Sequence, residues 1–283
     1  MSADPVAVRF SIVIPAHNEA DYLGATLESL QQQSFTGRYE VIVVDDGSSD
    51  QTAEIARSHG VHVVGELRLG VCAARQRGTE AARGEIVVST DADTVHPTDW
   101  LTRLDAQFRT GPVGVVAVAG PCWYQDPPWW AAIVPRVWFA AIAAAYARFG
   151  VVGYITATNV AFVRSSFPGY NTTLAQGGDE VDLLRRLRRC GRVVWDADNP
   201  VLTSSRRMDQ GLAHTLVVSY GYYYALSHTL NRLASRTVIG AAPPIRRAHQ
   251  TQVRLRRRRW RIGVLTAAAL VGLRRTRSRS RGR

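Results

Sequence analysis

The chain has 283 residues, of which 46% are apolar and 20% charged, so it can bury one large core. This balance excludes a low-complexity or intrinsically disordered chain. The net charge of +12 is unevenly spread. From Arg246 onward there are 14 arginines and no acids, and before it 35 − 14 = 21 arginines meet 23 acids, a net charge of −2. The body is therefore nearly neutral, and only the last part has the charge of a protein that binds anionic lipid or nucleic acid.

The first 120 residues alternate strand and helix patterns. Apolar, β-branched runs predict strands at residues 10–14, 40–44, 61–64, 85–89 and 113–119. Between them, apolar spacing and capping residues predict helices at about residues 21–33, 51–58 and 71–82, and from Pro97 onward. This alternation predicts an α/β fold with a doubly wound, mainly parallel sheet flanked by helices.

Beyond Pro121 the sequence becomes rich in Trp, Pro and Ala, and its periodicity is less clean. The patterns there predict a strand at residues 156–163, an amphipathic helix at 177–190, a short strand at 193–195 and a helix at 212–230. We predict a main domain at residues 1–242 and, at 243–283, an arginine-rich C-terminal extension with helical and disordered parts.

Cysteine usage and the N-terminus indicate a reducing compartment. The three cysteines are widely spaced and lack histidines at zinc spacing, so we expect free thiols at Cys72, Cys122 and Cys190. Residues 1–9 lack the apolar core of a signal peptide. Residues 129–147 and 262–273 are apolar and could lie in an interface, but neither has the roughly 18–20 uninterrupted apolar residues of a spanning helix. We therefore expect a cytoplasmic protein that can lie peripherally at the inner face of a membrane.

Polar, acid-bearing turns follow three of the predicted strands. The first strand leads into PAHNE at residues 15–19, the second into DDGS at 45–48, and the fourth into DAD at 91–93. The carboxyl ends of parallel strands are where open α/β sheets bind ligands. Acids gathered there suit a metal or a sugar hydroxyl between them. The pattern predicts an enzyme that handles a nucleotide and a divalent cation.

Five sequence blocks, in order and with sensible gaps, resemble the family 2 glycosyltransferases, which have the nucleotide-sugar-binding GT-A fold. The blocks are SIVIPAHNE at residues 11–19, VVDDGSSDQT at 43–52, AARQRG at 73–78, DAD at 91–93 and GGDEVDLLRRLRRCG at 177–191. Each is weak alone, but five in order are specific. The likeness runs from about residue 10 to residue 206, and it implies a nucleotide-binding half at residues 8–120 and an acceptor-side half at 121–242.

The resemblance implies roles on the donor side. His17 would lie beside the nucleobase, and Asp46 would accept the ring N–H of uracil or guanine. Glu19 would hold its turn or a ribose hydroxyl. Arg75 would face the diphosphate, with Arg77 competing for that role. Asp93 would bind Mg²⁺ or Mn²⁺, with Asp91 as its partner. The implied nucleotide-sugar site comprises Pro15, Ala16, His17, Glu19, Asp46, Arg75 and Asp91.

The acceptor side would centre on the predicted helix at residues 177–190. The family's usual Gly-Glu-Asp order is swapped here, because residues 178–182 read GDEVD. The general base that deprotonates the acceptor is therefore either Glu180, which the register favours, or Asp179. Acids in the first turn of a helix also interact favourably with its dipole, and this is the interpretation we prefer for Asp182.

Two further polar segments are ambiguous. Residues 156–164 resemble the segment that lines the acceptor side, but Thr158 and Asn159 would also suit a plain core strand. Asp196 and Asp198 repeat the Asp-x-Asp pattern after a short predicted strand. The family has no metal motif at that place, so we interpret this second pair as a turn.

The predicted function is a metal-dependent, inverting glycosyltransferase that moves a sugar from a UDP- or GDP-sugar to an acceptor hydroxyl. A polyprenyl-phosphate sugar synthase is the close alternative, which the basic tail and residues 129–147 favour and the acids at 179–180 disfavour. A sugar nucleotidyltransferase would need a catalytic lysine, and the sequence has no lysine. A nucleic-acid-binding protein would explain the tail but not the acid-lined turns, whereas an anionic membrane surface suits both tail and enzyme.

Overall fold

The computed structural model describes residues 7–65, 70–172, 179–206, 208 and 211–214. The chain divides into two compact units, residues 1–241 and 242–283. All of the described residues belong to the first unit. The predicted helix at 212–230 lies almost wholly outside the described residues and the arginine-rich extension entirely so, and the predicted boundary at residue 242 stays a prediction.

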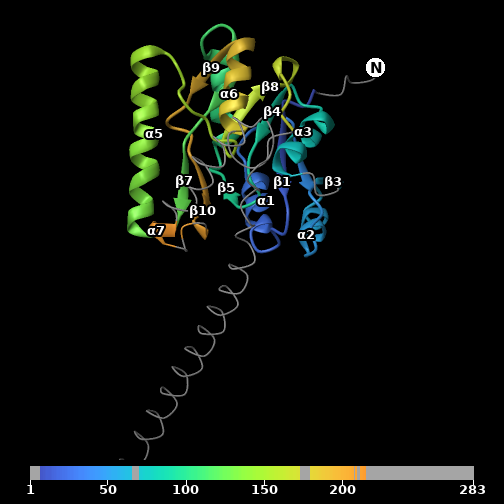
Figure 1. Ribbon diagram of the computed structural model, residues 1–283. Helices are drawn as coiled ribbons and strands as arrows, with labels where there is room; N and C mark the ends of the chain where they lie inside the picture. The colour runs from blue at the N-terminus through green and yellow to red at the C-terminus, as the bar shows by residue number, and fades with distance from the viewer. Residues whose placement is uncertain (1–6, 66–69, 173–178, 207, 209–210, 215–283) are drawn as a thin grey trace, which may run out of the picture. The chain divides into compact units, whose positions relative to one another are not determined.

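A seven-stranded sheet forms the centre of the domain (Figure 1). Its strand order is β3-β2-β1-β4-β8-β6-β9, and all neighbours are parallel except at β8, which runs antiparallel to both β4 and β6. The strands are β1 (Phe10–Ala16), β2 (Tyr39–Asp45), β3 (His62–Gly65), β4 (Ile86–Ser89), β6 (Val115–Ala119), β8 (Val160–Val163) and β9 (Arg192–Trp195). Central β4 is buried along its whole length, as expected of a strand covered on both faces.

A second, three-stranded sheet has the order β5-β10-β7. Its strands are β5 (Thr94–Val95), β7 (Cys122–Gln125) and β10 (Val201–Ser204). Strand β5 follows the DAD block directly, and β10 pairs with it in antiparallel register, Thr203 opposite Thr94. This small sheet therefore brings the segment after β10 next to the second aspartate of that block, because the backbone N–H of Ser204 donates to the Asp93 carbonyl at 3.0 Å.

Helices cover both faces of the large sheet (Figure 1). One core cluster contains the leucines of α1 (Leu23–Gln31) and the apolar side of α4 (Trp100–Thr110), with α2 (Thr52–Ser58) contributing Ala56. The other cluster lies under α3 (Val71–Ala81), α5 (Trp129–Phe149) and α6 (Asp179–Cys190). A short 3-10 turn, η1 (Arg164–Ser166), and a last helical turn, α7 (Leu212–His214), complete the described elements. The predicted doubly wound α/β arrangement is confirmed.

Helix α3 comes unusually close to β1 because of a glycine. A Cβ atom built on Gly78 would lie 2.3 Å from Val13 Cγ1, which is closer than any carbon–carbon contact allows. The glycine of the AARQRG block is therefore needed for packing. It lets α3 lie against the strand and so sets the position of Arg75, one turn earlier on the same helix.

After residue 121 one segment differs from the prediction, and another has a structure that the sequence left open. The predicted strand at 156–163 begins only at Val160, because residues 156–159 form a turn in which the Thr158 N–H donates to Thr156 Oγ1 at 3.3 Å. Residues 129–147, whose structure the sequence left open, lie in α5, a helix of 21 residues. Among the described helices, only α5 is long and apolar enough to cross a membrane, by length and composition alone, which is weak support for a span.

A buried histidine makes the stability of the fold depend on pH. His96 Nε2 lies 2.9 Å from Thr90 Oγ1, Nδ1 lies 3.1 Å from Ser29 Oγ, and burial lowers the pKa of His96 to about 3. The unfolded chain, with an ordinary histidine pKa of about 6.5, binds more protons between those values. We expect the free energy of unfolding to fall as pH drops from about 6.5 towards 3, with a slope approaching one proton. Urea titrations should show a shallower slope for His96→Gln and an unchanged slope for the exposed His62→Gln; equal slopes would contradict this account.

Candidate active site

The carboxyl ends of β1, β2 and β4 lie next to one another at one edge of the large sheet. Ala16, the last residue of β1, pairs in register with Asp45, the last residue of β2, and Pro15 pairs with Val44. Strand β4 pairs with the other side of β1, with Ser89 opposite Val13. The three polar turns predicted from the sequence therefore meet at this edge, as expected of a parallel sheet.

The first corner of the site is built from the turns after β1 and β2. His17 Nδ1 lies 2.8 Å from the Asp46 carbonyl oxygen, which places the ring proton on Nδ1. The Asp46 N–H donates to the Ala16 carbonyl at 2.8 Å, and its Oδ2 accepts from the Gly70 N–H at 3.2 Å. The half-buried imidazole thus lies against the backbone of Asp46, whose own carboxylate is buried, and the nucleobase roles of both residues stay predictions. The neighbouring Asp50 instead caps α2, accepting from the Thr52 N–H at 3.0 Å.

The first aspartate of the DAD block lies within a network that spans the site. Asp91 Oδ1 accepts from Arg75 Nη2 at 2.7 Å, and Asp91 Oδ2 accepts from Thr158 Oγ1 at 2.6 Å. Arg75 is 5% exposed, and its Nη1 donates to Asp179 Oδ2 at 3.2 Å. Burial alone would lower the pKa of Arg75, but the charges of Asp91 and Asp179 outweigh it and raise that pKa. A permanent cation therefore joins the DAD turn to the start of α6.

The second aspartate of the block has a different cation. Asp93 Oδ2 lies 2.9 Å from Arg206 Nη2, and Asp93 Oδ1 accepts from Thr203 Oγ1 at 3.2 Å. The same guanidinium forms a two-pronged ion pair with Glu19, at 2.5 and 2.8 Å, and lies 4.6 Å from the centre of the Tyr22 ring. Arg206 therefore draws the turns after β1, β4 and β10 together.

Glu19 has a structural role in this network. Its carbonyl accepts from the N–H groups of Tyr22 and Leu23 at 3.0 and 2.9 Å, which holds the turn before α1. Its side chain is 4% exposed and paired with Arg206. The turn-holding interpretation of Glu19 is therefore supported, whereas its contact with a ribose stays a prediction.

We expect Arg206→Gln to destabilise the fold strongly. The Glu19 carboxylate would remain buried without its counter-charge, and breaking a buried ion pair from one side costs about 3 kcal/mol. Chemical denaturation measures this loss. The matched control is Arg103→Gln, whose partners are the Asp99 side chain, 43% exposed, and the carbonyl of the exposed Asp198, so its loss should cost under about 1 kcal/mol. Similar losses for the two variants would show that the Arg206 network does not stabilise the fold.

The first turn of α6 presents two carboxylates in different surroundings. Asp179 pairs with Arg75, as described above. Glu180 Oε2 accepts from the Tyr154 hydroxyl at 2.6 Å, and Glu180 Oε1 accepts from the Ala157 N–H at 3.3 Å. Burial, followed by the charge of Asp179, raises the pKa of Glu180 above its ordinary value. Glu180 therefore has the higher proton affinity that suits a general base, whereas Asp179 is held by an arginine.

The competing residues have other partners. Arg77 is half-exposed and lies 3.8 Å from Glu80 on its own helix, and Asp182 pairs with Arg186 one turn on, at 2.7 Å. Asn159 is a core connector: it accepts from Trp100 Nε1 at 3.1 Å and donates to two backbone carbonyls, those of Pro121 and Asn199. Thr158 alone of the pair at 158–159 reaches the site.

The second Asp-x-Asp pair forms a turn, as predicted. Asp196 Oδ1 accepts from the Asp198 N–H at 3.2 Å, and Arg103 of α4 donates to the Asp198 carbonyl at 2.6 Å. These contacts hold the connection between β9 and β10 on the surface of α4. They involve the backbone of Asp198 and not its carboxylate.

The two thiols nearest the site are poor nucleophiles for a covalent intermediate. All three cysteines are free, as predicted. Burial, with a contribution from Asp179, raises the pKa of Cys72 to about 12. Burial and the charges of Asp91 and Asp93 raise the pKa of Cys122 as well. Both thiols are therefore protonated near neutral pH, and a thiol is a much weaker nucleophile than a thiolate.

Sequence reasoning missed Arg206, Tyr154 and Thr203. None of them lies in the five motif blocks. Arg206 could have been suspected from position alone, because it follows a short β-branched run in the way that the predicted site residues follow theirs. For Tyr154, which reaches Glu180 from an irregular segment, we find no signal in the sequence.

The charges already present allow a test of whether a hard divalent cation fits this site. Asp91 and Asp93 offer carboxylate oxygens, which Mg²⁺ and Mn²⁺ prefer. A guanidinium lies against each of them, so the site already stabilises positive charge beside these acids. Within the described ranges, no three His, Cys, Asp or Glu side chains gather as a complete ligand set. The residues therefore fit a cation that Asp93 holds together with substrate phosphates and water, the usual way in which proteins bind Mg²⁺.

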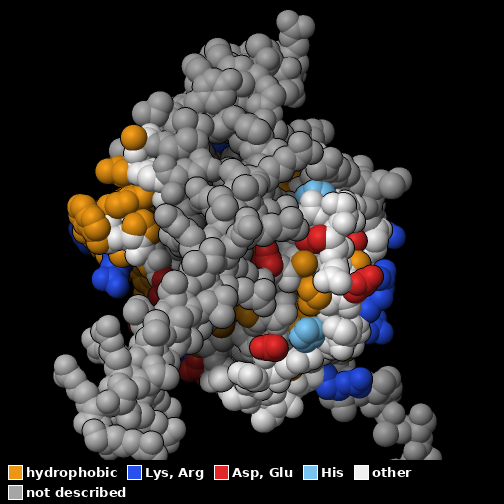
Figure 2. All heavy atoms as spheres, turned by 90° about the horizontal axis from the view of Figure 1, so that it is seen from below, with side chains coloured by type: hydrophobic (Ala, Val, Ile, Leu, Met, Phe, Trp, Pro, Cys, Tyr) orange, Lys and Arg blue, Asp and Glu red, His pale blue; other side chains and the backbone are white. Residues whose placement is uncertain are grey.

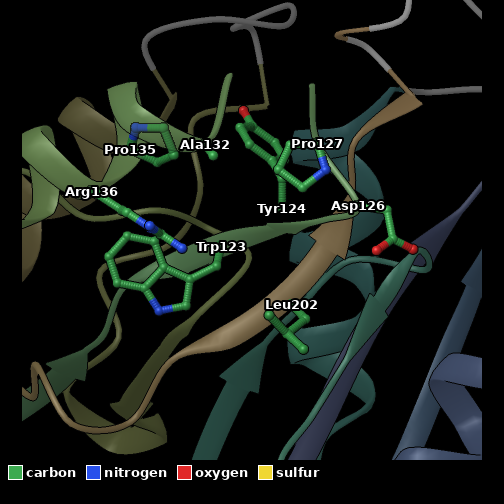
Figure 3. A pocket seen from close by; sticks show the side chains of 8 residues that line it. All are labelled: Trp123, Tyr124, Asp126, Pro127, Ala132, Pro135, Arg136 and Leu202. Atoms are coloured by element: carbon green, nitrogen blue, oxygen red, sulfur yellow. The ribbon is translucent and has the colours of Figure 1, made fainter. Parts of the chain in front are cut away.

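A cavity of about 490 Å³ lies apart from these carboxylates, between α5 and the small sheet (Figure 3). None of the predicted site residues lines it. Arg136 extends from α5 toward the Trp123 indole, and Leu202 faces the cavity from β10 (Figure 3). Its lining is aromatic and apolar with two charged side chains, and comprises Trp123, Tyr124, Asp126, Pro127, Ala132, Pro135, Arg136 and Leu202.

Comparison with known sequences agrees with the motif blocks. The model of the glycosyl transferase family 2 matches residues 11–168, more than half of the chain. Over 116 residues the chain is 35% identical to an undecaprenyl-phosphate 4-deoxy-4-formamido-L-arabinose transferase of Klebsiella pneumoniae subsp. pneumoniae, covering 38% of this chain and 36% of that protein. The chain spans about a third of the length of the curated relatives it matches.

Solved structures with a similar fold include two that contain Mn²⁺. One is mannosyltransferase PcManGT of Pyrobaculum calidifontis with GDP-Man and Mn²⁺, with a TM-score of 0.58 and 20% identity over 86% of this chain and 70% of that one. The other is glucosyl-3-phosphoglycerate synthase of Mycobacterium tuberculosis with Mn²⁺, UDP and glucosyl-3-phosphoglycerate, with a TM-score of 0.53 and 22% identity over 83% of this chain and 82% of that one. At these identities the likeness shows the fold, and the predicted GT-A-like fold is confirmed.

Proposed function

Because this chain belongs to glycosyltransferase family 2, we propose that it moves a sugar from a UDP- or GDP-sugar to an acceptor hydroxyl, with inversion at the transferred carbon. The observation that carries the proposal is the position of Arg75, which bonds both Asp91 of the DAD turn and Asp179 of α6. The donor-side and acceptor-side acids thus belong to one connected site. In a single in-line displacement, the donor and the acceptor meet at one sugar, so the acids that serve the donor and the acids that serve the acceptor have to lie in the same site.

On the donor side, the chain's own residues would bind and orient the nucleotide. The His17 ring can stack on the base, and Asp46 can accept the ring N–H that uracil and guanine have and that adenine and cytosine lack. Arg75 and Arg206 neutralise part of the charge of the carboxylates around them, and the rest of the positive charge that a diphosphate needs would come from a bound cation. These roles rest on family resemblance together with the contacts described above.

A divalent cation, Mg²⁺ or Mn²⁺, would be held by Asp93 and would neutralise the charge that develops on the departing diphosphate. Support comes from the carboxylate donors and from the two structures of similar fold that contain Mn²⁺. Arg206 shares Asp93 Oδ2, so this guanidinium would adjust its contact when the cation binds.

On the acceptor side, Glu180 would take the proton from the attacking hydroxyl. Its raised pKa makes it a better base than an ordinary glutamate at neutral pH, and the Tyr154 hydroxyl keeps its carboxylate oriented. Asp179 would orient Arg75 instead. This division of roles favours Glu180 in the choice that the swapped acid order leaves open.

We expect Tyr154→Phe to shift the pH dependence of transfer. The lost hydrogen bond stabilised the Glu180 carboxylate, so the pKa of Glu180, already raised by burial, should rise further. A general base works only when deprotonated, and so the acidic limb of the pH–rate profile should move to higher pH. Tyr39→Phe, which removes a hydroxyl bonded to the Leu30 carbonyl away from the site, is the control. An unmoved limb in Tyr154→Phe would argue against Glu180 as the base.

A polyprenyl-phosphate acceptor is the second candidate. The Klebsiella relative is named for an undecaprenyl-phosphate substrate, which favours this alternative. A phosphate acceptor is already ionised and needs no strong base, so a buried glutamate with a raised pKa speaks for a hydroxyl. We also infer a cytoplasmic chain held at the inner face of an anionic membrane, with its 14 C-terminal arginines contributing attraction.

The proposal is tested by thermal unfolding of the full chain with UDP, GDP, their sugars, ADP and CDP, with and without Mn²⁺. We expect a higher melting temperature with uridine or guanosine diphosphates, and a larger increase when Mn²⁺ is present. Equal shifts with ADP and CDP would remove the assigned role of Asp46. No shift with any nucleotide would overturn the proposal for a hydroxyl acceptor and for a lipid-phosphate acceptor alike, because both use a nucleotide-sugar donor.

A further inference from the structure

Helix α5 presents an exposed apolar face to solvent. Five large apolar side chains on it are 52–78% exposed, although such residues are usually buried: Trp129, Ile133, Val134, Val137 and Trp138. They recur four residues apart, so they share one side of the helix. Orange side chains gather at the left of Figure 2, on the side that α5 occupies in Figure 1, with blue arginine side chains at their edge.

The opposite face of α5 holds the helix against the domain. Phe139 and Ile142 are buried in the core cluster shared with α6. The Phe139 ring stacks on Trp195 of β9 with centroids 5.7 Å apart, and meets Trp123 of β7 edge-on at 5.5 Å. A helix fixed in this way lies along the domain surface, and crossing a bilayer would require it to give up these contacts. The exposed side of α5 therefore points to solvent, while its buried side is fixed to the core of the domain.

The charge of this region complements an anionic surface. Between Asp126 and Asp179 the sequence contains no acid, while Arg136 and Arg148 are exposed on α5. Tryptophan is enriched where proteins meet the headgroup level of a membrane, and arginine adds attraction to anionic lipids. The combination favours a lipid surface over a protein partner.

The exposed face is connected to the acceptor side of the site. The Trp138 ring meets Tyr154 edge-on at 5.9 Å, and the Tyr154 hydroxyl donates to Glu180 at 2.6 Å. The cavity beside α5 is lined by Arg136 and by the aromatic residues of β7 (Figure 3). A surface that covers this face of α5 therefore lies one side chain away from the tyrosine that holds the base.

We propose that the exposed face of α5 docks on an anionic lipid bilayer and thereby brings the acceptor side of the site to a lipid-borne acceptor. The proposal deepens the proposed function and rests on it for the role of Glu180. The docking itself requires only the face and its charge. It also gives the arginine-rich extension a complementary role, since long-range attraction by the tail would bring the chain to the surface on which α5 settles.

Sedimentation of the full chain with vesicles of mixed phosphatidylglycerol and phosphatidylcholine tests the docking. At about 1 M salt the Debye length is about 3 Å, so attraction by arginines is screened and apolar insertion remains. Val137→Asp should then lower the partition coefficient roughly tenfold or more. The matched control is Val113→Asp, because Val113 is the most exposed large apolar residue of the described chain, at 97%, and lies outside α5. This variant should sediment like the unaltered protein.

A second measurement does not depend on a destabilising change. A fluorophore attached to Val137→Cys should be quenched by lipid-borne quenchers, whereas one on Ser58→Cys, an exposed position of α2, should not. Exposed Cys190 is replaced by serine in both proteins. Equal quenching at the two positions, or equal sedimentation of Val137→Asp and unaltered protein, would overturn the proposal. A change of oligomeric mass in Val137→Asp without a change in vesicle binding would also overturn it, in favour of a second copy of this chain.

Thermal shifts with nucleotide, measured on the same proteins, separate this proposal from the proposed function. A chain that binds vesicles through α5 but no nucleotide would overturn the glycosyl transfer and leave the docking intact. A chain that binds nucleotide but shows no difference between Val137→Asp and Val113→Asp would overturn the docking alone. Unchanged nucleotide shifts in Val137→Asp show that this exposed substitution leaves the fold intact.

Discussion

Replacing Glu180 with glutamine is expected to lower the rate of transfer by roughly 10²–10⁴ while leaving donor affinity unchanged. Glutamine has the same shape and can still accept from the Tyr154 hydroxyl, but its amide cannot take a proton from the acceptor. The base acts on the acceptor and not on the nucleotide, so the two effects should separate. Initial rates at saturating donor, together with calorimetric titration of the nucleotide, measure them.

Asp179→Asn is the matched control for this prediction. Asparagine keeps an oxygen for Arg75 but loses the charge that neutralises it, so donor binding should change at least as much as turnover. If the large rate loss occurs in Asp179→Asn and not in Glu180→Gln, the base is Asp179 and the assignment by register is wrong. If neither variant loses rate, no strong base is needed, and a lipid-phosphate acceptor explains the site better.

The sheet and the position of the site could be predicted because their signals are local. The apolar runs at the centres of β1, β2 and β4 are buried, so these stretches of each strand are β-branched and apolar. Parallel strands place their following turns at one edge, which is enough to bring His17, Asp46 and Asp91 together. The sequence shows the glycine of AARQRG, but only the structure shows why it is needed: Gly78 lets α3 pack closely against β1.

The contacts that complete the site depend on long-range packing. Arg206 is 187 residues from Glu19 along the chain, and Tyr154 is 26 residues from Glu180 in a segment without regular structure. No periodicity or motif links such pairs, because the small sheet and the turn before β8 bring them together. The structure of α5 was left open for a different reason: its apolar residues surround most of the helix, so the sequence lacks the one-sided pattern that marks an amphipathic helix.

Replacing Asp93 with alanine is expected to abolish transfer and to remove the enhancement of nucleotide binding by Mn²⁺. Asp93 is the carboxylate that we propose for the cation, and a diphosphate leaving group depends on charge neutralisation. The fold should persist, because Arg206 keeps its two-pronged pair with Glu19 when the Asp93 carboxylate is lost. Calorimetric titration with UDP and with GDP, each with and without Mn²⁺, measures the enhancement directly and independently of turnover.

Asp198→Ala provides the comparison, since it removes an aspartate from the other Asp-x-Asp pair. The described contacts of Asp198 involve its backbone N–H and carbonyl, which alanine retains, so both transfer and metal enhancement should survive. Enhancement that persists in Asp93→Ala would place the cation elsewhere. If the unaltered protein shows no enhancement but Asp93→Ala still loses transfer, the positive charge at this carboxylate comes from Arg206 alone. The chain would then be a metal-independent member of its family, with a guanidinium where we propose a divalent cation.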